Sequence, residues 1–202
     1  MNRFLISFVS IYLLVFVSSL NGQEPLSRIH CGQMLDIKNS LVRNNVMISI
    51  DQGSGKIKSL DFDYSKTDYD DIDTLNLSNY FCLPGLIDMH THISEDHYRP
   101  LVDYLTMTQQ EQIAIGRGLV KKTLLAGFTS VRDLGVYIAW TDKLLRDEIN
   151  AGLTDGPRMQ ISGFYLTIPG GGGDIDVPGY TGNVPAHIRQ GVTQGVENFR
   201  NR

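Results

Sequence analysis

Hydrophobic positions recur along this chain with two different periods. Before about residue 80 they alternate with polar positions, as in Val46, Ile48 and Ile50, and this pattern predicts short strands joined by turns. After residue 80, short apolar runs alternate with longer segments of helical period. We therefore expect buried strands at 81–87, 128–131 and 158–162, helices at 106–125 and 140–149, and a third helix from Pro185 onwards.

Strands that alternate with helices in this way predict βαβ units and a parallel sheet, so the expected class is α/β. Polar groups and glycines follow the predicted strands. His90 and His92 come after the first, Asp133 closes the second, and residues 170–173, all glycine, follow the third. Because parallel strands end at the same edge of a sheet, we expect these residues to gather there.

The first 22 residues differ in kind from the rest. Arg3 precedes an uncharged, mainly apolar run at 4–17, and small or polar residues follow it. This order is typical of a secretory signal peptide, so we expect removal of residues 1–22 and a secreted or lumenal protein. In an oxidising compartment Cys31 and Cys82 could pair, but a free buried thiol at Cys82 fits its apolar surroundings equally well.

Charge restricts the choice of partners. Charged residues make up 20% of the chain and the net charge is −4, so no basic surface for nucleic acid is expected. No segment after the signal peptide has the pattern of a basic amphipathic membrane helix. We expect neither nucleic acid nor, after cleavage of the signal peptide, a membrane as partner.

The strongest chemical candidates are His90 and His92. In extended backbone, residues two apart point the same way, so both imidazoles can converge on one ion. Zinc favours nitrogen ligands, and catalytic zinc commonly has three protein ligands and a water. The alternative is two ordinary polar histidines in a loop. The other histidines, His30, His97 and His187, match no motif and are expected at the surface.

Two aspartates lie beside this pair in the predicted fold, and each has two interpretations. Asp88 could orient a ligand histidine as an outer carboxylate, or its side chain could cap a turn. Asp133 could line a pocket, or it could pair with the neighbouring Arg132.

Three segments resemble one known family. Residues 83–92, reading Leu-Pro-Gly-Leu-Ile-Asp-Met-His-Thr-His, closely resemble the signature of the amidohydrolase superfamily. Residues 126–133 resemble its second-strand motif, and residues 156–163 its third strand. The match is nearest to the branch that holds imidazolonepropionase-like enzymes and metal-dependent dipeptidases and carboxypeptidases, and it runs from about Ile29 to the end.

The resemblance implies a (β/α)8 TIM barrel beside a small β-sandwich. Residues 23–80 would supply the first strands of the sandwich, and residues 81–202 the first three βα units of an incomplete barrel. It also implies a divalent metal, zinc being expected, as one or two ions held in part by His90 and His92. The family's other ligands are a carboxylated lysine, two histidines and an aspartate that acts as general base. They lie on later strands, so we expect the chain to be a fragment without activity of its own.

The implied reaction is hydrolysis of C–N bonds in amides or short peptides, as in dipeptidases and carboxypeptidases. A cyclic-amide hydrolase and a catalytically inactive, truncated remnant are the alternatives. One departure concerns the pocket. Residues 168–174 resemble a loop that usually reads glycine-glycine-histidine-glycine, and Gly172 stands in place of the histidine. A side chain that family members present to the substrate is therefore missing.

Overall fold

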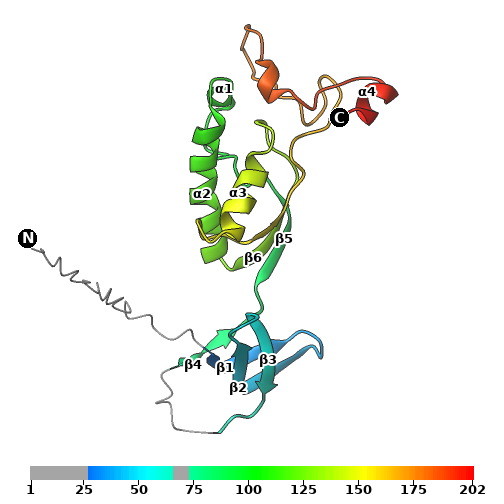
Figure 1. Cartoon of the computed structure of the whole chain (residues 1–202). Helices are drawn as coiled ribbons and strands as arrows, with labels where there is room; N and C mark the ends of the chain where they lie inside the picture. The colour runs from blue at the N-terminus through cyan, green and yellow to red at the C-terminus, as the bar shows by residue number, and fades with distance from the viewer. Residues whose placement is uncertain (1–26, 66–72) are drawn as a thin grey trace, which may run out of the picture. The chain divides into compact units, whose positions relative to one another are not determined.

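The computed structural model of the chain describes residues 27–65 and 73–202, and the predicted signal peptide lies outside the described residues. The chain divides into two compact units, Met1–Pro84 and Gly85–Arg202, each with its own sheet (Figure 1). Strands and helices are mixed, and the sheet of the second unit is parallel, which confirms the predicted α/β class. None of the helices within the described ranges is long and apolar enough to cross a membrane.

The N-terminal unit is a four-stranded sheet with the order β3-β2-β1-β4. Neighbours pair antiparallel except for β1 and β4, which run parallel. The alternating segment around Val46 forms β2, as its period predicts. The strands are β1 (Arg28–Asp36), β2 (Leu41–Asp51), β3 (Lys56–Asp61) and β4 (Thr74–Cys82).

The core of this unit is small. Cys31, Met34 and Val46 are buried, and partly buried neighbours pack against them. His30 is also buried, with 2% exposed, so the expectation of a surface position was wrong. It lies on β1, which is paired on both sides, and its ring packs against Tyr64 at 5.5 Å.

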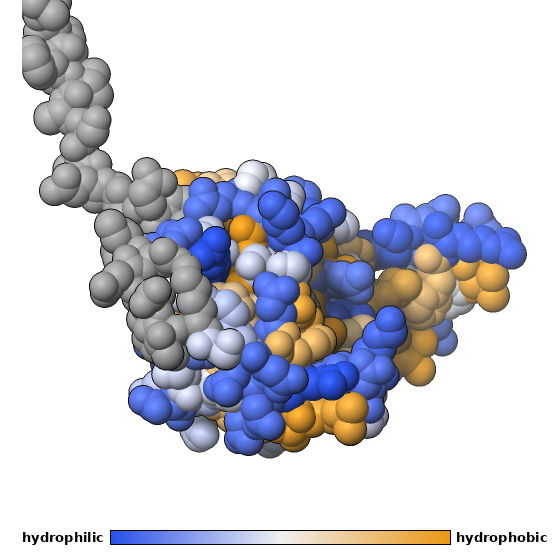
Figure 2. Space-filling model, turned by 90° about the horizontal axis from the view of Figure 1, so that it is seen from below, coloured by the Kyte–Doolittle hydropathy of each residue, from blue (hydrophilic) through white to orange (hydrophobic). Residues whose placement is uncertain are grey.

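Many apolar side chains of the N-terminal unit are exposed. Figure 2, which views the molecule from below, shows hydrophobic residues beside hydrophilic ones on the surface. A single sheet cannot bury both of its faces, so such exposure is expected of one layer without its partner. The predicted β-sandwich stays a prediction. The exposed residues include Leu41, Val42, Ile57, Leu60, Phe62, Leu75, Tyr80 and Phe81.

A disulfide between Cys31 and Cys82 links β1 to β4. The Cα atoms are 6.0 Å apart, and the paired positions are separated by 51 residues in sequence. Parallel pairing brings Met34 opposite Cys82, so the end of β4 lies alongside the part of β1 that holds Cys31. The structure thus selects the pairing from the two alternatives that the sequence leaves open.

The second unit contains the parallel sheet, in the order β5-β6-β7. Helix α2 connects β5 to β6, and α3 connects β6 to β7, so the chain makes two βαβ units (Figure 1). Two short helices, α1 (Leu101–Tyr104) and α4 (Val196–Arg200), and a single 3-10 turn complete it. The main elements are β5 (Leu86–Thr91), α2 (Gln109–Leu125), β6 (Phe128–Asp133), α3 (Thr141–Asn150) and β7 (Arg158–Gln160).

The core of this unit lies between the sheet and the two longer helices. Val120 of α2 and Leu145 of α3 are fully buried against Val131 of β6 and Met159 of β7. Helix α2 starts at a capping box. The Thr108 hydroxyl oxygen accepts the backbone N–H of Glu111, and the Glu111 carboxylate accepts the backbone N–H of Thr108. The helices predicted at 106–125 and 140–149 are therefore confirmed, with the first beginning three residues later than expected.

The first predicted strand of this unit was wrong in its bounds and its burial. Phe81 and Cys82 belong to β4 of the N-terminal unit, and β5 begins only at Leu86. Pro84 has no N–H to donate to a sheet, so the break between β4 and β5 falls at this proline. Within the described residues β5 pairs only with β6, and Ile87 is 64% exposed. The strand therefore runs through His90 rather than ending before it.

The helix predicted from Pro185 onwards was also wrong. The segment forms a 3-10 turn at Ala186–Ile188 and then a separate short helix, α4. Glycine explains the break, since a Cβ at Gly191 would collide with the backbone carbonyl oxygen of Tyr165. Here Val192 makes a parallel bridge with Thr167. Tertiary contact with the loop after β7 thus replaces a continuous helix.

Removal of the disulfide is expected to destabilise the N-terminal unit. The variant Cys31→Ala with Cys82→Ala should lower the free energy of unfolding by about 2–4 kcal/mol, because the unfolded chain loses a long-range restraint. Urea denaturation monitored by circular dichroism measures the change. Reduced wild type should resemble the variant, and the variant should not respond to reductant. Equal stability of oxidised and reduced wild type would contradict the pairing.

Candidate metal site at the carboxyl end of the parallel sheet

His90 and His92 lie together at the carboxyl end of β5. His90 is near the end of the strand and is exposed, whereas His92 follows it and is half-buried. Their ring centroids are 5.4 Å apart and the ring planes are inclined at 78°. The extended backbone therefore brings both imidazoles to one place, as their spacing predicts.

The ring of His92 has one nitrogen that is already bonded. Nδ1 lies 3.1 Å from the carbonyl oxygen of Gly135 and 2.8 Å from the hydroxyl oxygen of Tyr165. A carbonyl oxygen can only accept, so a hydrogen bond to Gly135 requires the hydrogen on Nδ1. Nε2 then keeps its lone pair, which is the state that a histidine needs to bind a metal.

Asp133 lies at the end of β6 and is fully buried. One carboxylate oxygen accepts the backbone N–H of Ile93 at 2.6 Å, and the other accepts that of Gly135 at 3.1 Å. Asp133 thereby ties the loop after β5 to the loop after β6, on either side of His92. Arg132 donates to the Met89 carbonyl oxygen. The expected alternative in which Asp133 pairs with Arg132 is therefore not observed.

Asp88 makes a local contact. Its carboxylate accepts the backbone N–H of His90 at 3.0 Å, two residues further along β5. The side chain thereby constrains the backbone that carries His90, and the choice between its two interpretations stays a prediction.

A cavity of about 380 Å³ opens beside His92. Its wall comes from the loop after β5, from α1 and from the loops after β6 and β7. Gly172 lies in this wall, so the glycine tract does reach the same end of the sheet as the histidines. An added Cβ at Gly172 would meet nothing within 4 Å, so the missing side chain leaves open space. The lining residues are His92, Glu95, Asp96, His97, Arg99, Leu101, Tyr104, Tyr137, Tyr165 and Gly172.

Most residues of this wall carry no sequence motif, and the two with the strongest contacts behind His92 are Glu95 and Tyr165. Glu95 is buried, with 9% exposed, and both of its oxygens lie within 3.3 Å of the Tyr165 hydroxyl oxygen. The tyrosine comes from the loop after β7, where no motif marks it. In the sequence, Glu95 is marked only by its place three residues after His92, and an acidic residue at that spacing is too common to indicate a role.

Burial raises the pKa of the two carboxyl groups behind His92. For Glu95 it raises the pKa to about 8, and the nearby Asp133 charge adds to the shift, while the hydrogen bond from Tyr165 lowers it. For Asp133 burial raises the pKa to about 7, against the lowering effect of the N–H groups of Ile93 and Gly135. Burial of these two carboxyl groups therefore makes a site where protons are held near neutral pH.

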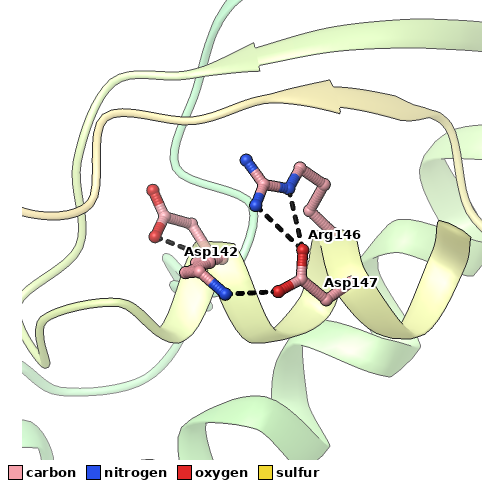
Figure 3. Close-up of polar contacts among 4 residues, drawn as sticks. Asp142, Arg146 and Asp147 are labelled. Carbon is pink, nitrogen blue, oxygen red and sulfur yellow. Dashed lines mark hydrogen bonds and ion pairs between the residues drawn. The ribbon is translucent and has the colours of Figure 1, made fainter.

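The first turn of α3 positions the chain that carries Tyr165. Asp142 is fully buried, and its carboxylate accepts the N–H of Lys143 within the helix and that of Gly163 after β7. Figure 3 shows Asp142 near Arg146 and Asp147, which bond each other. The contact to Gly163 fixes where the loop leaves the sheet, two residues before Tyr165.

The donor set meets part of what a divalent ion needs. His90 and His92 supply two imidazole nitrogens, which suit zinc. Within residues 27–65 and 73–202 no group of three or more His, Cys, Asp or Glu side chains is placed to hold an ion. The described residues therefore fit part of a metal site, and the ligand roles of both histidines stay predictions.

Stability without added metal should fall as the pH rises from about 4.5 to 8. Glu95 has a raised pKa in the folded state, so the folded protein keeps a proton that the unfolded chain releases in this range. The slope approaches about 1.4 kcal/mol per pH unit for each such proton. Glu95→Gln should flatten the upper part of the profile, measured by urea denaturation at several pH values. An unchanged slope in Glu95→Gln would show that Glu95 titrates normally.

Comparison with known proteins gives the family of this site. The model of the amidohydrolase family matches residues 81–202, more than half of the chain. No curated protein sequence matches the chain.

Solved structures share the fold. A Xaa-Pro dipeptidase with bound methionine is 29% identical with a TM-score of 0.65, and the match covers 83% of this chain and 41% of the dipeptidase. A prolidase complexed with N-methylphosphonate-L-proline is 26% identical with a TM-score of 0.67, covering 84% and 41%. A zinc-complexed atrazine chlorohydrolase from Arthrobacter aurescens TC1 is 16% identical with a TM-score of 0.51, covering 67% and 35%, and shows likeness of fold alone.

This chain spans about two fifths of the length of the dipeptidase and the prolidase. The matched residues include β5 with His90, the following His92, β6 with Asp133, and the loop that carries Tyr165 and Gly172. Because the family model matches more than half of the chain, the chain belongs to the amidohydrolase family.

Proposed function

We propose that this chain supplies part of the metal site of a hydrolase that cleaves amide bonds in short peptides, in the manner of a dipeptidase. The observation that carries the proposal is the pair of imidazoles at the end of β5, with Nδ1 of His92 bonded and its Nε2 left for a ligand. Zinc is the proposed metal, because two neutral imidazoles are ligands that zinc favours.

In this proposal His90 and His92 hold the ion, and the rest of the site supports them. A divalent ion supplies the chemistry of the family by lowering the pKa of a water and polarising the carbonyl of the substrate. Asp133 holds the loops on both sides of His92 through backbone N–H groups. Two donors leave an ion under-coordinated, so further ligands and a general base are proposed to come from outside the described residues.

The proposed substrate class is small. The cavity beside His92, at about 380 Å³, is of the size that holds a small molecule or a short peptide. Arg99 brings a guanidinium to its wall, and such groups bind carboxylates, which every peptide has at one end. The dipeptidase and prolidase relatives are named for cleaving dipeptides. At Gly172 the open space indicates that substrate contact there differs from what a histidine would make.

We also propose that the protein is secreted or lumenal. The disulfide between Cys31 and Cys82 supports this, because such bonds persist in oxidising compartments and are rare in the cytosol of most organisms.

The ligand assignment predicts that His90→Ala and His92→Ala each remove metal and activity together. We expect kcat/KM for Xaa-Pro dipeptides to fall by more than about a hundredfold. Even loss of a residue that only hydrogen-bonds a metal ligand lowers metal affinity or activity by about 10–100-fold. Zinc content and hydrolysis are measured for the protein as its gene encodes it. His187→Ala is the matched control, because His187 is exposed and lies outside the cavity.

Other outcomes of that experiment separate the alternatives. Bound zinc with turnover of cyclic amides in place of dipeptides would assign the other hydrolase class. Neither zinc nor turnover in the wild type would favour a catalytically inactive remnant. Full turnover in both histidine variants would overturn the ligand assignment.

The proposed localisation predicts a shortened N-terminus. When the gene is expressed in a cell with an active secretory route, the mature protein should begin at about residue 23, because the uncharged run after Arg3 has the features of a signal peptide. N-terminal sequencing of the secreted fraction measures this. A protein that remains in the cytosol and still starts at Met1 would contradict the proposal.

A further inference from the structure

A second set of contacts lies behind His92 and is not needed for metal binding as such. The hydrogen on Nδ1 of His92 is shared between the Gly135 carbonyl at 3.1 Å and the Tyr165 hydroxyl oxygen at 2.8 Å. Because that oxygen accepts from the imidazole, the proton of the hydroxyl must point elsewhere. Glu95 is placed to accept it, with oxygens at 3.2 and 3.3 Å.

Glu95 is itself held in place. It is buried, and the backbone N–H of Tyr137 donates to its carboxyl group. A carboxyl group has an oxygen that can accept in either protonation state, so Glu95 can take the Tyr165 hydroxyl proton whether or not it is ionised, and the Gly135 carbonyl, which only accepts, favours hydrogen on Nδ1. With hydrogen on Nδ1, the hydrogen bonds run from the imidazole to the tyrosine and from the tyrosine to the acid.

The position of the Tyr165 side chain is tightly constrained. A Cβ at Gly135 would collide with its ring, and a Cβ at Gly173 would collide with its Cβ. The ring of Tyr137 packs against it with centroids 5.3 Å apart. Absence of side chains at two glycines thus creates the space that Tyr165 fills, and little freedom remains for its hydroxyl to leave His92.

From this chain of contacts we infer that Tyr165 and Glu95 are positioning residues for His92. They hold its ring in one orientation and in the tautomer with hydrogen on Nδ1, so that Nε2 faces outward as an acceptor. The inference rests on the proposed function for its purpose, since an imidazole fixed in this state is ready for a metal ion. The hydrogen-bond chain itself can be measured without metal or substrate.

The chain of bonds predicts that the two positions are not independent. In Tyr165→Phe, the Gly135 carbonyl remains as the one acceptor for Nδ1, so hydrogen on Nδ1 should be less strongly favoured than in wild type. In Glu95→Leu, the Tyr165 hydroxyl loses its acceptor and turns its proton towards Nδ1, which favours hydrogen on Nε2. The double variant has no hydroxyl to turn, so it should return to the state of Tyr165→Phe. If the two substitutions instead damaged the structure independently, their effects on the His92 tautomer would add in the double variant.

The experiment is a long-range ¹H–¹⁵N correlation spectrum of the metal-free protein labelled at its five histidines, at a pH where the rings are neutral. His92→Gln identifies the signal. Wild type should show a single tautomer with protonated Nδ1. Glu95→Gln, which keeps an accepting oxygen, should preserve it, as should the control Tyr137→Phe, which removes a hydroxyl from the same cavity wall.

Two results would overturn the inference. The first is hydrogen on Nε2 of His92 in the wild-type protein. The second is that Tyr165→Phe and Glu95→Leu both give the same His92 signals as the wild-type protein. Should Glu95→Leu fail to fold, judged by its amide spectrum, the comparison of Tyr165→Phe with Tyr137→Phe decides. Titration with zinc separates the two proposals. Tyr165→Phe should weaken zinc binding about 10–100-fold, whereas a fixed tautomer in a protein that binds no zinc supports the positioning role and refutes the metal site.

Discussion

The carboxylate of Asp133 is the contact on which the site depends. Parallel strands end at a common edge, where the loops that follow have backbone N–H groups without a partner in the sheet. Asp133 accepts two of these, from Ile93 and Gly135. The first comes directly after His92, and the second belongs to the residue whose carbonyl bonds the imidazole. One buried side chain thereby sets the relative position of the ligand candidate and of the group that orients it.

This arrangement has an energetic cost. Two carboxyl groups, Asp133 and Glu95, are buried near each other, and burial raises the pKa of both. Replacement by apolar side chains would avoid the desolvation of the acids but would leave the N–H groups and the Tyr165 hydroxyl unsatisfied. The two perturbed carboxyl groups lie where the loops meet the sheet, and perturbed pKa values commonly cluster at functional sites.

Helices and glycines carry the rest of the support. The first turn of α3 fixes Gly163 through the buried Asp142, and the loop beyond it leads to Tyr165. Further along, Arg189 forms two hydrogen bonds with Asp174 and so anchors the glycine tract. The tract is therefore held from outside while its inner side lies against Tyr165 and the cavity. Within this tract, Gly173 allows close packing against Tyr165, whereas its neighbour Gly172 faces open space.

Hydrophobic period and local motifs were enough to place most elements of the second unit and the histidine pair. A strand and a helix each bury one face, so β6, α2 and α3 follow from the spacing of apolar residues alone. The spacing of His90 and His92 likewise puts both rings on one side of β5 before any long-range contact is known. Tertiary structure decided what spacing does not encode. It joined Cys31 to Cys82, broke the segment after Pro185 where Gly191 approaches Tyr165, and brought Glu95 and Tyr165 together across about 70 residues. Those contacts form only when separate strands and loops pack together, because their partners are distant in sequence and each residue alone carries no local signal.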